Sequence, residues 1–280
     1  MSVRIVIDST VDVPESIKKK MTVVPLSILF GDEAYVDGVT ITHKEFYEKL
    51  IESDVLPTTS QATPASFVEI FEETKAAGDE VVVLTLSSKF SGTCQSAMIA
   101  AQDYDHVYVV DTQTVAIGSG ILAELALYLA AEGMDAQGIA RRIEEEREHV
   151  RLVALLDTLE YLKKGGRISK TVAFAGGLLS IKPVVGVRDG VIEMLGKARG
   201  SRQGNNLLVK EIEAAGGVDF SKPVLLGYTG LSDHLLRKYV NDSAYLWQDS
   251  VEELPYTMIG STVGTHVGPG AIAVAFFSKA

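Results

Sequence analysis

The sequence predicts an α/β fold with two lobes: an α/β/α lobe with a mainly parallel sheet, and an α+β lobe with a mixed sheet. Two observations carry this prediction. Short β-branched runs alternate with helical patterns over residues 1–150, and hairpin and helix patterns follow over residues 151–280. Strand–helix alternation is typical of a parallel sheet covered by helices, whereas a hairpin requires antiparallel neighbours. No repeat or low-complexity linker separates the halves, so we expect them to be rigidly joined.

Four runs of the first lobe are predicted to be strands. Several lack the alternation of apolar and polar residues, which favours strands buried on both faces. They are Arg4–Asp8, Thr22–Phe30, Glu80–Ser87 and His106–Asp111.

Helical patterns fill the intervals between these strands. They cover His43–Ser53, Ala65–Gly78, Gly92–Gln102, Ala116–Ala131 and Asp135–Val150. The run from Ala116 is the longest apolar stretch, but it contains Glu124 and is shorter than the roughly 20 residues that span a bilayer. We therefore predict a buried helix there. With no signal peptide evident at the N-terminus, we expect a soluble, cytoplasmic protein without membrane insertion.

The second lobe is predicted to begin with a strand and a short helix, and the next feature is a hairpin whose turn is Asp189–Gly190. A glycine-rich loop that contains His266 precedes the final strand. In chain order the predicted elements are the strand Arg151–Thr158, the helix Leu159–Ser169, the hairpin Ile181–Arg199, the helix Ser201–Ala215, the strand Pro223–Gly230, the helix Ser232–Asp242 and the strand Ala271–Phe277.

Composition excludes several classes of partner. The chain has 280 residues with 26 Lys and Arg against 37 Asp and Glu, a net charge of −11. Nucleic-acid binding needs clustered cations, and anionic lipid surfaces repel an acidic protein. The single cysteine, Cys94, excludes an internal disulfide and a cysteine-based zinc site. We interpret it as a small buried apolar residue.

Polar residues gather where the predicted strands end. In open α/β sheets, ligands bind beyond the carboxyl ends of the strands, where helix N-termini also point. The simpler interpretation of each cluster is helix capping. Four such clusters at one sheet edge, however, predict an anion site lined by hydroxyls, without a metal ion and without Lys or Arg side chains that pair with the anion. The clusters are Asp8–Thr10, Leu56–Pro64, Ser87–Thr93 and Asp111–Thr112.

Several catalytic patterns fit poorly. The two aspartates of DSTVD (residues 8–12) are four positions apart rather than two, which disfavours a phosphatase nucleophile strand. GSGILA (residues 118–123) begins too far after Asp111 for a dinucleotide-binding turn, so its glycines are expected to permit close helix packing. No phosphate-binding P-loop motif occurs. A dyad of Ser91 and His266 stays open, although Ser91 lacks the preceding glycine of a nucleophile elbow.

Seven segments, taken together and in order, resemble the DegV family of bacterial fatty-acid-binding proteins, which includes the binding subunit of fatty-acid kinase. They are DST (8–10), TTSQATP (58–64), SSKFSGTCQSA (87–97), DT (111–112), LEYLKKGGRIS (159–169), IKP (181–183) and THVGPGAIAVAF (265–276). The resemblance implies a long-chain fatty acid in a tunnel between two lobes, with no cofactor and no catalysis by this chain.

The resemblance also implies roles for particular residues. Thr59 and Ser91 would hold the fatty-acid carboxylate, and His266 would belong to the polar network beside it. Weaker candidates for that network are Ser60, Gln61, Ser87, Ser88, Gly92 and Thr93. A separate ATP-dependent kinase would make the acyl phosphate, with Arg167 and Arg202 helping to dock it.

The tunnel walls are expected among Phe174, Ala175–Ile181 and Ile28–Phe30, with plain core as the alternative for each. Two other functions stay open from the sequence. One is a lipid or ester hydrolase that uses Ser91 and His266, and the other is a binding protein for a different small carboxylate or phosphate.

Overall fold

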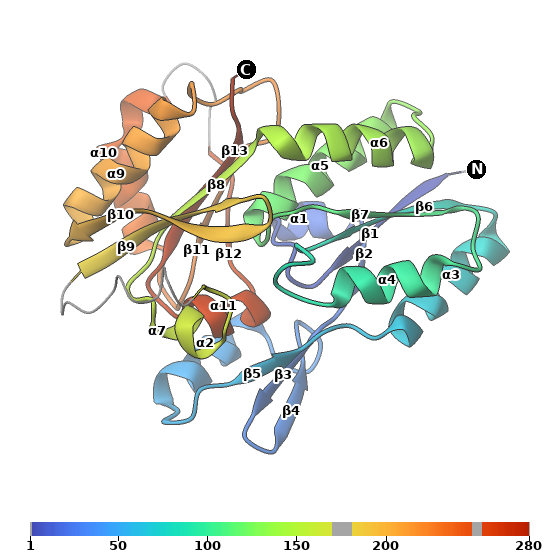
Figure 1. Cartoon of the computed structure of the whole chain (residues 1–280), viewed down its shortest axis with the longest axis horizontal. Coiled ribbons are helices and arrows are strands. Elements are labelled where there is room, and N and C mark those ends of the chain that lie inside the picture. Colours follow the sequence, from blue (N-terminus) through green and yellow to red (C-terminus); the bar gives the residue numbers. More distant parts are fainter. Residues whose placement is uncertain (1, 170–180, 248–253, 280) are drawn as a thin grey trace.

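The computed structural model describes residues 2–169, 181–247 and 254–279. Its strands form a four-stranded sheet, a six-stranded sheet and a small three-stranded sheet. Figure 1 shows the first two side by side, with α2, α7 and α11 gathered beneath them near the small sheet. This arrangement confirms the predicted fold class of a parallel sheet and a separate mixed sheet.

The four-stranded sheet is parallel throughout. Its order is β2 (Thr22–Val24), β1 (Val3–Asp8), β6 (Glu80–Thr85) and β7 (Val107–Asp111). The helices α3 (Pro64–Ala77) and α4 (Thr93–Ala101) cover one face, and α5 (Ile117–Ala131) and α6 (Ala136–Glu146) cover the other (Figure 1). Burial on both faces explains why these strands lack alternation.

The six-stranded sheet is mixed. Its order is β10 (Val191–Arg199), β9 (Ile181–Arg188), β8 (Val150–Leu155), β13 (Ile272–Phe277), β11 (Leu225–Tyr228) and β12 (Tyr256–Met258). Only the pair of β11 and β12 is parallel among the described ladders of this sheet. The helices α9 (Ser201–Ala214) and α10 (His234–Asp242) pack on one face. The turn Asp189–Gly190 has positive φ at both residues, 50° and 77°, as the predicted hairpin requires.

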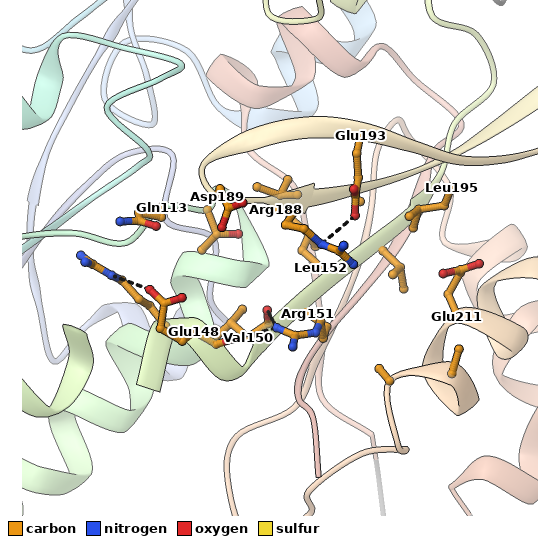
Figure 2. Close-up of a pocket in the computed structure, with 17 residues that line it drawn as sticks. Gln113, Glu148, Val150, Arg151, Leu152, Arg188, Asp189, Glu193, Leu195 and Glu211 are labelled. Atoms are coloured by element: carbon orange, nitrogen blue, oxygen red, sulfur yellow. Dashed lines mark hydrogen bonds and ion pairs between the residues drawn. The ribbon is translucent and has the colours of Figure 1, made fainter. Parts of the chain in front are cut away.

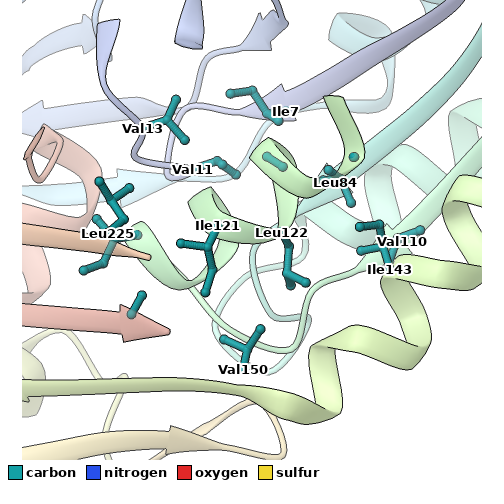
Figure 3. Packing of buried hydrophobic residues seen from close by; sticks show 14 of the residues in the cluster. Ile7, Val11, Val13, Leu84, Val110, Ile121, Leu122, Ile143, Val150 and Leu225 are labelled. Carbon is teal, nitrogen blue, oxygen red and sulfur yellow. The ribbon is translucent and has the colours of Figure 1, made fainter. Parts of the chain in front are cut away.

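Helix α5 joins the two large sheets. Its side chains Ile121 and Leu122 lie between Ile7 of the parallel sheet and Leu225 of the mixed sheet, within one buried cluster (Figure 3). A Cβ atom at Gly120 would overlap the carbonyl oxygen of Asp12. The glycines of the GSGILA segment therefore permit close packing, as predicted, and the sheets share one core.

The prediction of a single strand over Thr22–Phe30 is wrong. The chain forms β2, leaves the parallel sheet, and then forms β3 (Ser27–Phe30) in the small antiparallel sheet with β4 (Glu33–Val36) and β5 (Thr58–Ser60). Pro25 lies at the break, and proline has no N–H to continue a strand ladder. This sheet packs against α2 (His43–Glu52).

The predicted glycine-rich loop around His266 is also wrong. Residues Ser261–Val267 form α11, and the turn Gly268–Gly270 follows it. The predicted helix Asp135–Val150 likewise ends early, at Glu146. The remaining described elements are α1 (Glu15–Lys18), η1 (Arg147–His149), α7 (Glu160–Lys164) and η3 (Ala244–Leu246). Within the described ranges, no helix has the length and apolar character needed to cross a membrane.

Candidate functional site

A cavity of about 570 Å³ lies where the small sheet, α11, α7 and the hairpin meet the end of β6. We call it the mouth cavity. Most of its polar lining residues come from β5, from the loop before α4 and from α11. Its apolar ones come from loops, from α7, from β10 and from α11. They are Thr10, Leu26, Thr59, Ser60, Gln61, Leu86, Ser88, Lys89, Phe90, Ser91, Gly92, Val115, Leu162, Arg167, Ile192, Thr262, Val263, His266 and Val267. Three segments far apart in the sequence thus meet here.

The first polar pair of the mouth cavity joins β5 to α11. A hydrogen bond of 2.9 Å links the Thr59 hydroxyl and Nε2 of His266. Thr59 is fixed by the ladder between β5 and β3, where it pairs with Ile28. His266 lies in the last turn of α11, so a strand and a helix hold the two side chains in place.

The imidazole of His266 is neutral near pH 7. Burial, together with the smaller effect of the positive charge of Arg167, lowers its pKa to about 4. Its Nδ1 atom is buried without a hydrogen-bond partner among the described residues. A Cβ atom at Gly165, just after α7, would overlap this nitrogen, so only a glycine fits there.

Ser91 approaches the cavity from the loop before α4. Its hydroxyl lies 2.9 Å from the Thr93 hydroxyl and accepts a hydrogen bond of 3.2 Å from the Thr93 N–H. Gln61 packs against Gly92, where a Cβ atom would overlap its amide, and its Nε2 donates to Ser96 over 3.0 Å. This contact holds the segment after β5 against the start of α4.

The geometry of Ser91 and His266 does not support the hydrolase hypothesis. Nε2 of His266 is bonded to Thr59, whereas the Ser91 hydroxyl is bonded to Thr93. A nucleophile needs a base within hydrogen-bond reach, and the base faces a different hydroxyl here.

Some predicted site residues lie away from the cavity. The buried Ser87 hydroxyl donates to the carbonyl oxygen of Gly190 over 2.8 Å, which ties the loop to the hairpin turn. Thr93 is buried beneath the loop. Arg202 is exposed in the first turn of α9 and does not line the cavity.

Arg167 does line the mouth cavity, and protein atoms already bind part of its guanidinium. Nε donates to the carbonyl oxygen of Phe90 over 3.2 Å, and Nη1 donates to that of Gly165 over 2.7 Å. Lys89 is a second cation in the lining, and it is exposed. Sequence reasoning missed it because an isolated lysine in a loop has no distinguishing pattern.

Two of the four predicted polar clusters serve the fold locally. The buried carboxylate of Asp8 accepts hydrogen bonds from the N–H and hydroxyl of Thr10 and from the N–H of Leu86, at 2.5–2.8 Å. Burial raises the pKa of Asp8 to about 6 despite these bonds. Asp111 accepts from the N–H groups of Gln113 and Ser88. These carboxylates fix loops rather than cap helices, because the helices that follow, α1, α4 and α5, have no side-chain cap.

A second, smaller cavity of about 60 Å³ continues from the mouth cavity. Every residue in its lining is apolar or a glycine, and we call it the apolar chamber. The two cavities share Val115, Leu162, Ile192, Val263 and Val267. A ligand with a polar head and an apolar tail would therefore pass from hydroxyls to an apolar end between the mixed sheet and the segment Val115–Ala116 before α5.

The sequence did not locate this chamber. Of the predicted wall, Phe174 and residues 175–180 lie outside the described residues, and Ile181 is described but lines neither cavity. Ile28 and Phe30 pack with Phe46 against α2 instead, so plain core is the correct interpretation for them. Within the described ranges, no group of three or more histidine, cysteine, aspartate or glutamate side chains is arranged to hold a metal ion.

Comparison with known proteins shows which family has this sequence and architecture. The family model described as "Uncharacterised protein, DegV family" matches residues 2–279. The chain belongs to the DegV family. A DegV domain-containing protein of Caldanaerobacter subterraneus subsp. tengcongensis is 34% identical over 283 residues, which cover 99% of each chain. One from Deinococcus radiodurans is also 34% identical over 283 residues, with 98% of each chain covered.

Solved structures of the DegV family have the same fold. A fatty-acid-binding DegV family protein from Thermus thermophilus superposes with a TM-score of 0.88 at 32% identity, covering 100% of both chains. A stearic-acid-binding protein from Eubacterium ventriosum gives a TM-score of 0.85 at 26% identity, covering 100% of this chain and 99% of the other. These relatives bind fatty acids.

Proposed function

We propose that this protein binds one long-chain fatty acid, with the carboxylate at Thr59, Ser91 and His266 and the acyl chain directed into the apolar chamber. The observation that carries the proposal is the continuity of the two cavities: a hydroxyl-lined mouth shares five residues with an end lined by apolar residues and a glycine. Fatty-acid binding by the similar Thermus thermophilus protein supports the same conclusion.

The polar end of the site matches a carboxylate without an ion pair. The hydroxyls of Thr59 and Ser91 can donate to its two oxygens, and hydrogen bonds to a charged group contribute about 1.5–3 kcal/mol each. His266 is neutral, so it supports Thr59 through the hydrogen bond of 2.9 Å rather than through charge. The N-terminus of α4 adds a favourable dipole beside Ser91.

The acyl chain supplies most of the affinity. Burial of a methylene group is worth about 0.8 kcal/mol, so roughly 14 methylenes contribute on the order of 11 kcal/mol before the entropy of association is subtracted. The head group therefore fixes the orientation of the fatty acid in the site, and the tail determines its affinity.

A carboxylate held by hydroxyls keeps its nucleophilicity, which fits transfer to a separate enzyme. In this proposal a carboxylate oxygen attacks the γ-phosphorus of ATP on a partner kinase, ADP leaves, and the acyl phosphate remains on this chain. Arg167 at the mouth and the exposed Arg202 contact the kinase. The protein has no catalytic activity of its own and supplies acyl groups for phospholipid metabolism.

Native mass spectrometry of the purified protein, followed by organic extraction, tests lipid binding. We expect an added mass of one C14–C18 fatty acid per chain, which the Thr59→Ala/Ser91→Ala variant loses. The matched control is Thr58→Ala/Ser232→Ala, since both residues are exposed and outside the cavity. A wild-type protein that is empty and refuses added fatty acid would sink the proposal.

The kinase step has a separate test. We expect Arg202→Ala to bind fatty acid normally and to reduce acyl-phosphate formation at least ten-fold when the cognate kinase and ATP are added. Lys210→Ala, on the same helix, is the control. Equal rates for the two variants would remove Arg202 from the docking surface.

A further inference from the structure

The ladder between β8 and β9 stops partway along both strands. Its described pairs are Val153 with Gly186, Ala154 with Val185 and Leu155 with Val184. Both strands nevertheless continue, because β8 pairs with β13 back to Val150 and β9 pairs with β10 as far as Arg188. The two strands therefore diverge beyond Val153 and Gly186. We call the opening between residues 150–152 and 187–188 the β8–β9 gap.

A third cavity, of about 290 Å³, lies over this gap on the outside of the molecule. Figure 2 shows its rim of charged side chains, with Arg188 paired to Glu193 over 3.3 Å. We call it the outer cavity. Its charged lining residues come from η1, β8, the hairpin and α9, and they are Arg147, Glu148, Arg151, Arg188, Asp189, Glu193 and Glu211.

The outer cavity and the apolar chamber have a common wall. Leu152, Gly186 and Val187 line both cavities. Gly186 has no side chain to thicken this wall, and a Cβ atom there would lie 3.0 Å from Cδ1 of Leu195 and 3.4 Å from the carbonyl oxygen of Leu152. Leu152, which is 8% exposed, thus provides much of the apolar barrier between the chamber and the charged rim.

We propose that the wall formed by Leu152, Gly186 and Val187 is the blind end of the acyl site, and that the Leu152 side chain sets the longest chain the protein accommodates. This inference rests on the proposed function. The chamber, of about 60 Å³, has roughly a tenth of the 570 Å³ of the mouth cavity, so it takes only the last carbons of a tail. A longer chain meets Leu152, and beyond it the charged rim of the outer cavity.

The proposal predicts a break in the dependence of affinity on chain length. Each buried methylene tightens the Kd by about four-fold, so the Kd of saturated fatty acids falls by this factor per carbon until the wall is reached. Beyond that length, additional methylenes give no further gain. The position of the break reports where the tail ends.

Variants of Leu152 move this break in opposite directions. We expect Leu152→Ala to shift it to chains two or three carbons longer, and Leu152→Phe to shift it to chains one or two carbons shorter. Leu155→Ala is the matched control, because Leu155 is on the same strand but packs on the other face of the sheet, against Gly204 of α9. Leu155→Ala should lose about as much stability as Leu152→Ala, and its affinity should break at the same chain length as that of the wild type. Competition among saturated C12–C22 fatty acids, read by native mass spectrometry, gives the position of the break for each variant.

A label at the tail end tests the location without any substitution. A fatty acid with a terminal diazirine should crosslink, on irradiation, to peptides that contain Leu152 or Val187. An unchanged break in both Leu152 variants, or crosslinks confined to other segments, would overturn this inference while the proposed function stands. A wild-type protein that binds no fatty acid would overturn both.

Discussion

Two polar clusters lie close together in this molecule and behave differently. The buried carboxylate cluster consists of Asp8, Asp12 and Asp37, whose residues are at most 4% exposed. The mouth triad consists of Thr59, Ser91 and His266, which are half-buried around a cavity. Both clusters contain polar residues near the ends of strands, such as Asp8 and Thr59. The local sequence alone therefore does not tell the buried cluster from the one that lines a cavity.

The difference lies in what satisfies the polar atoms. Oδ2 of Asp37 accepts from the N–H and hydroxyl of Thr262, at 3.2 and 2.7 Å, and from the Ser9 hydroxyl at 3.1 Å. Oδ1 of Asp12 accepts from the N–H of Gly260 at 2.8 Å. These two carboxylates thus hold the N-terminus of α11, and the other end of that helix carries His266. The first cluster positions the helix and the second lines the mouth cavity, so the two clusters differ in their burial.

The largest expected effect comes from breaking the buried cluster. Asp37→Ala leaves three buried donors without their acceptor, so the free energy of unfolding should fall by about 3 kcal/mol. Urea denaturation measures it. The control is Asp157→Ala, which removes an exposed ion pair with Lys182 and should cost less than about 1 kcal/mol. Similar losses for the two variants would contradict the role assigned to Asp37.

The next effect tests how tightly His266 is packed. Gly165→Ala should destabilise the protein by about 2 kcal/mol, because the new methyl group overlaps the imidazole. Its backbone φ of −73° is compatible with alanine. The loss should therefore largely disappear when Gly165→Ala is made in a His266→Ala background. An equal loss in both backgrounds would mean that another contact is responsible.

Within the mouth triad, an isosteric change should spare the fold and weaken the ligand. Thr59→Val removes one donor to the carboxylate, worth about 1.5 kcal/mol, so the Kd for palmitate should rise roughly ten-fold. The melting temperature should fall by only a few degrees, because the variant also loses the hydrogen bond between Thr59 and His266. Thr58→Val, at the exposed neighbouring position of β5, is the control for the substitution itself. An unaltered Kd in Thr59→Val would exclude a contact between Thr59 and the head group.

The last prediction is a pH dependence of stability from His266. Its pKa is about 4 in the folded protein and near 6.5 in the unfolded chain. Between these values the unfolded state binds the proton and the folded state does not, so stability falls as the pH is lowered from 6.5 towards 4. His266→Gln lacks this contribution. The stability of the wild type relative to His266→Gln should therefore decline over that range, while the contribution of Asp8 is common to both proteins. A constant difference would show that His266 titrates alike in both states.

Sequence patterns predicted the regular elements well where local chemistry decides them. The β-branched runs gave β1, β6 and β7, and the Asp189–Gly190 pair gave the hairpin turn. The errors fall where short segments depend on distant partners. The segment Ser261–Val267 contains one glycine, two threonines and two valines, which are poor helix formers, and it becomes helical through contacts with Asp37, Asp12 and Tyr47.

The residues of the candidate site also differ in how far the local sequence indicates them. Thr59, Ser91 and His266 could be nominated from motifs, because hydroxyls at a helix entrance and an isolated histidine between glycines are visible in one dimension. That these three side chains line one cavity depends on which loops the sheets bring together. The same is true of Ser87, whose hydroxyl bonds to the carbonyl oxygen of Gly190 and not to the cavity.

The sequence by itself thus determined the alternation of elements, the net charge of −11 and the polar clusters where strands end, since these follow from local periodicity and side-chain chemistry. Only the tertiary structure decided which aspartates are buried and where the apolar chamber lies. The chamber lies where the segment Val115–Ala116, just before α5, meets the mixed sheet and where β8 and β9 diverge beyond Val153 and Gly186. Both are properties of packing between segments far apart in the chain, and no local pattern encodes them.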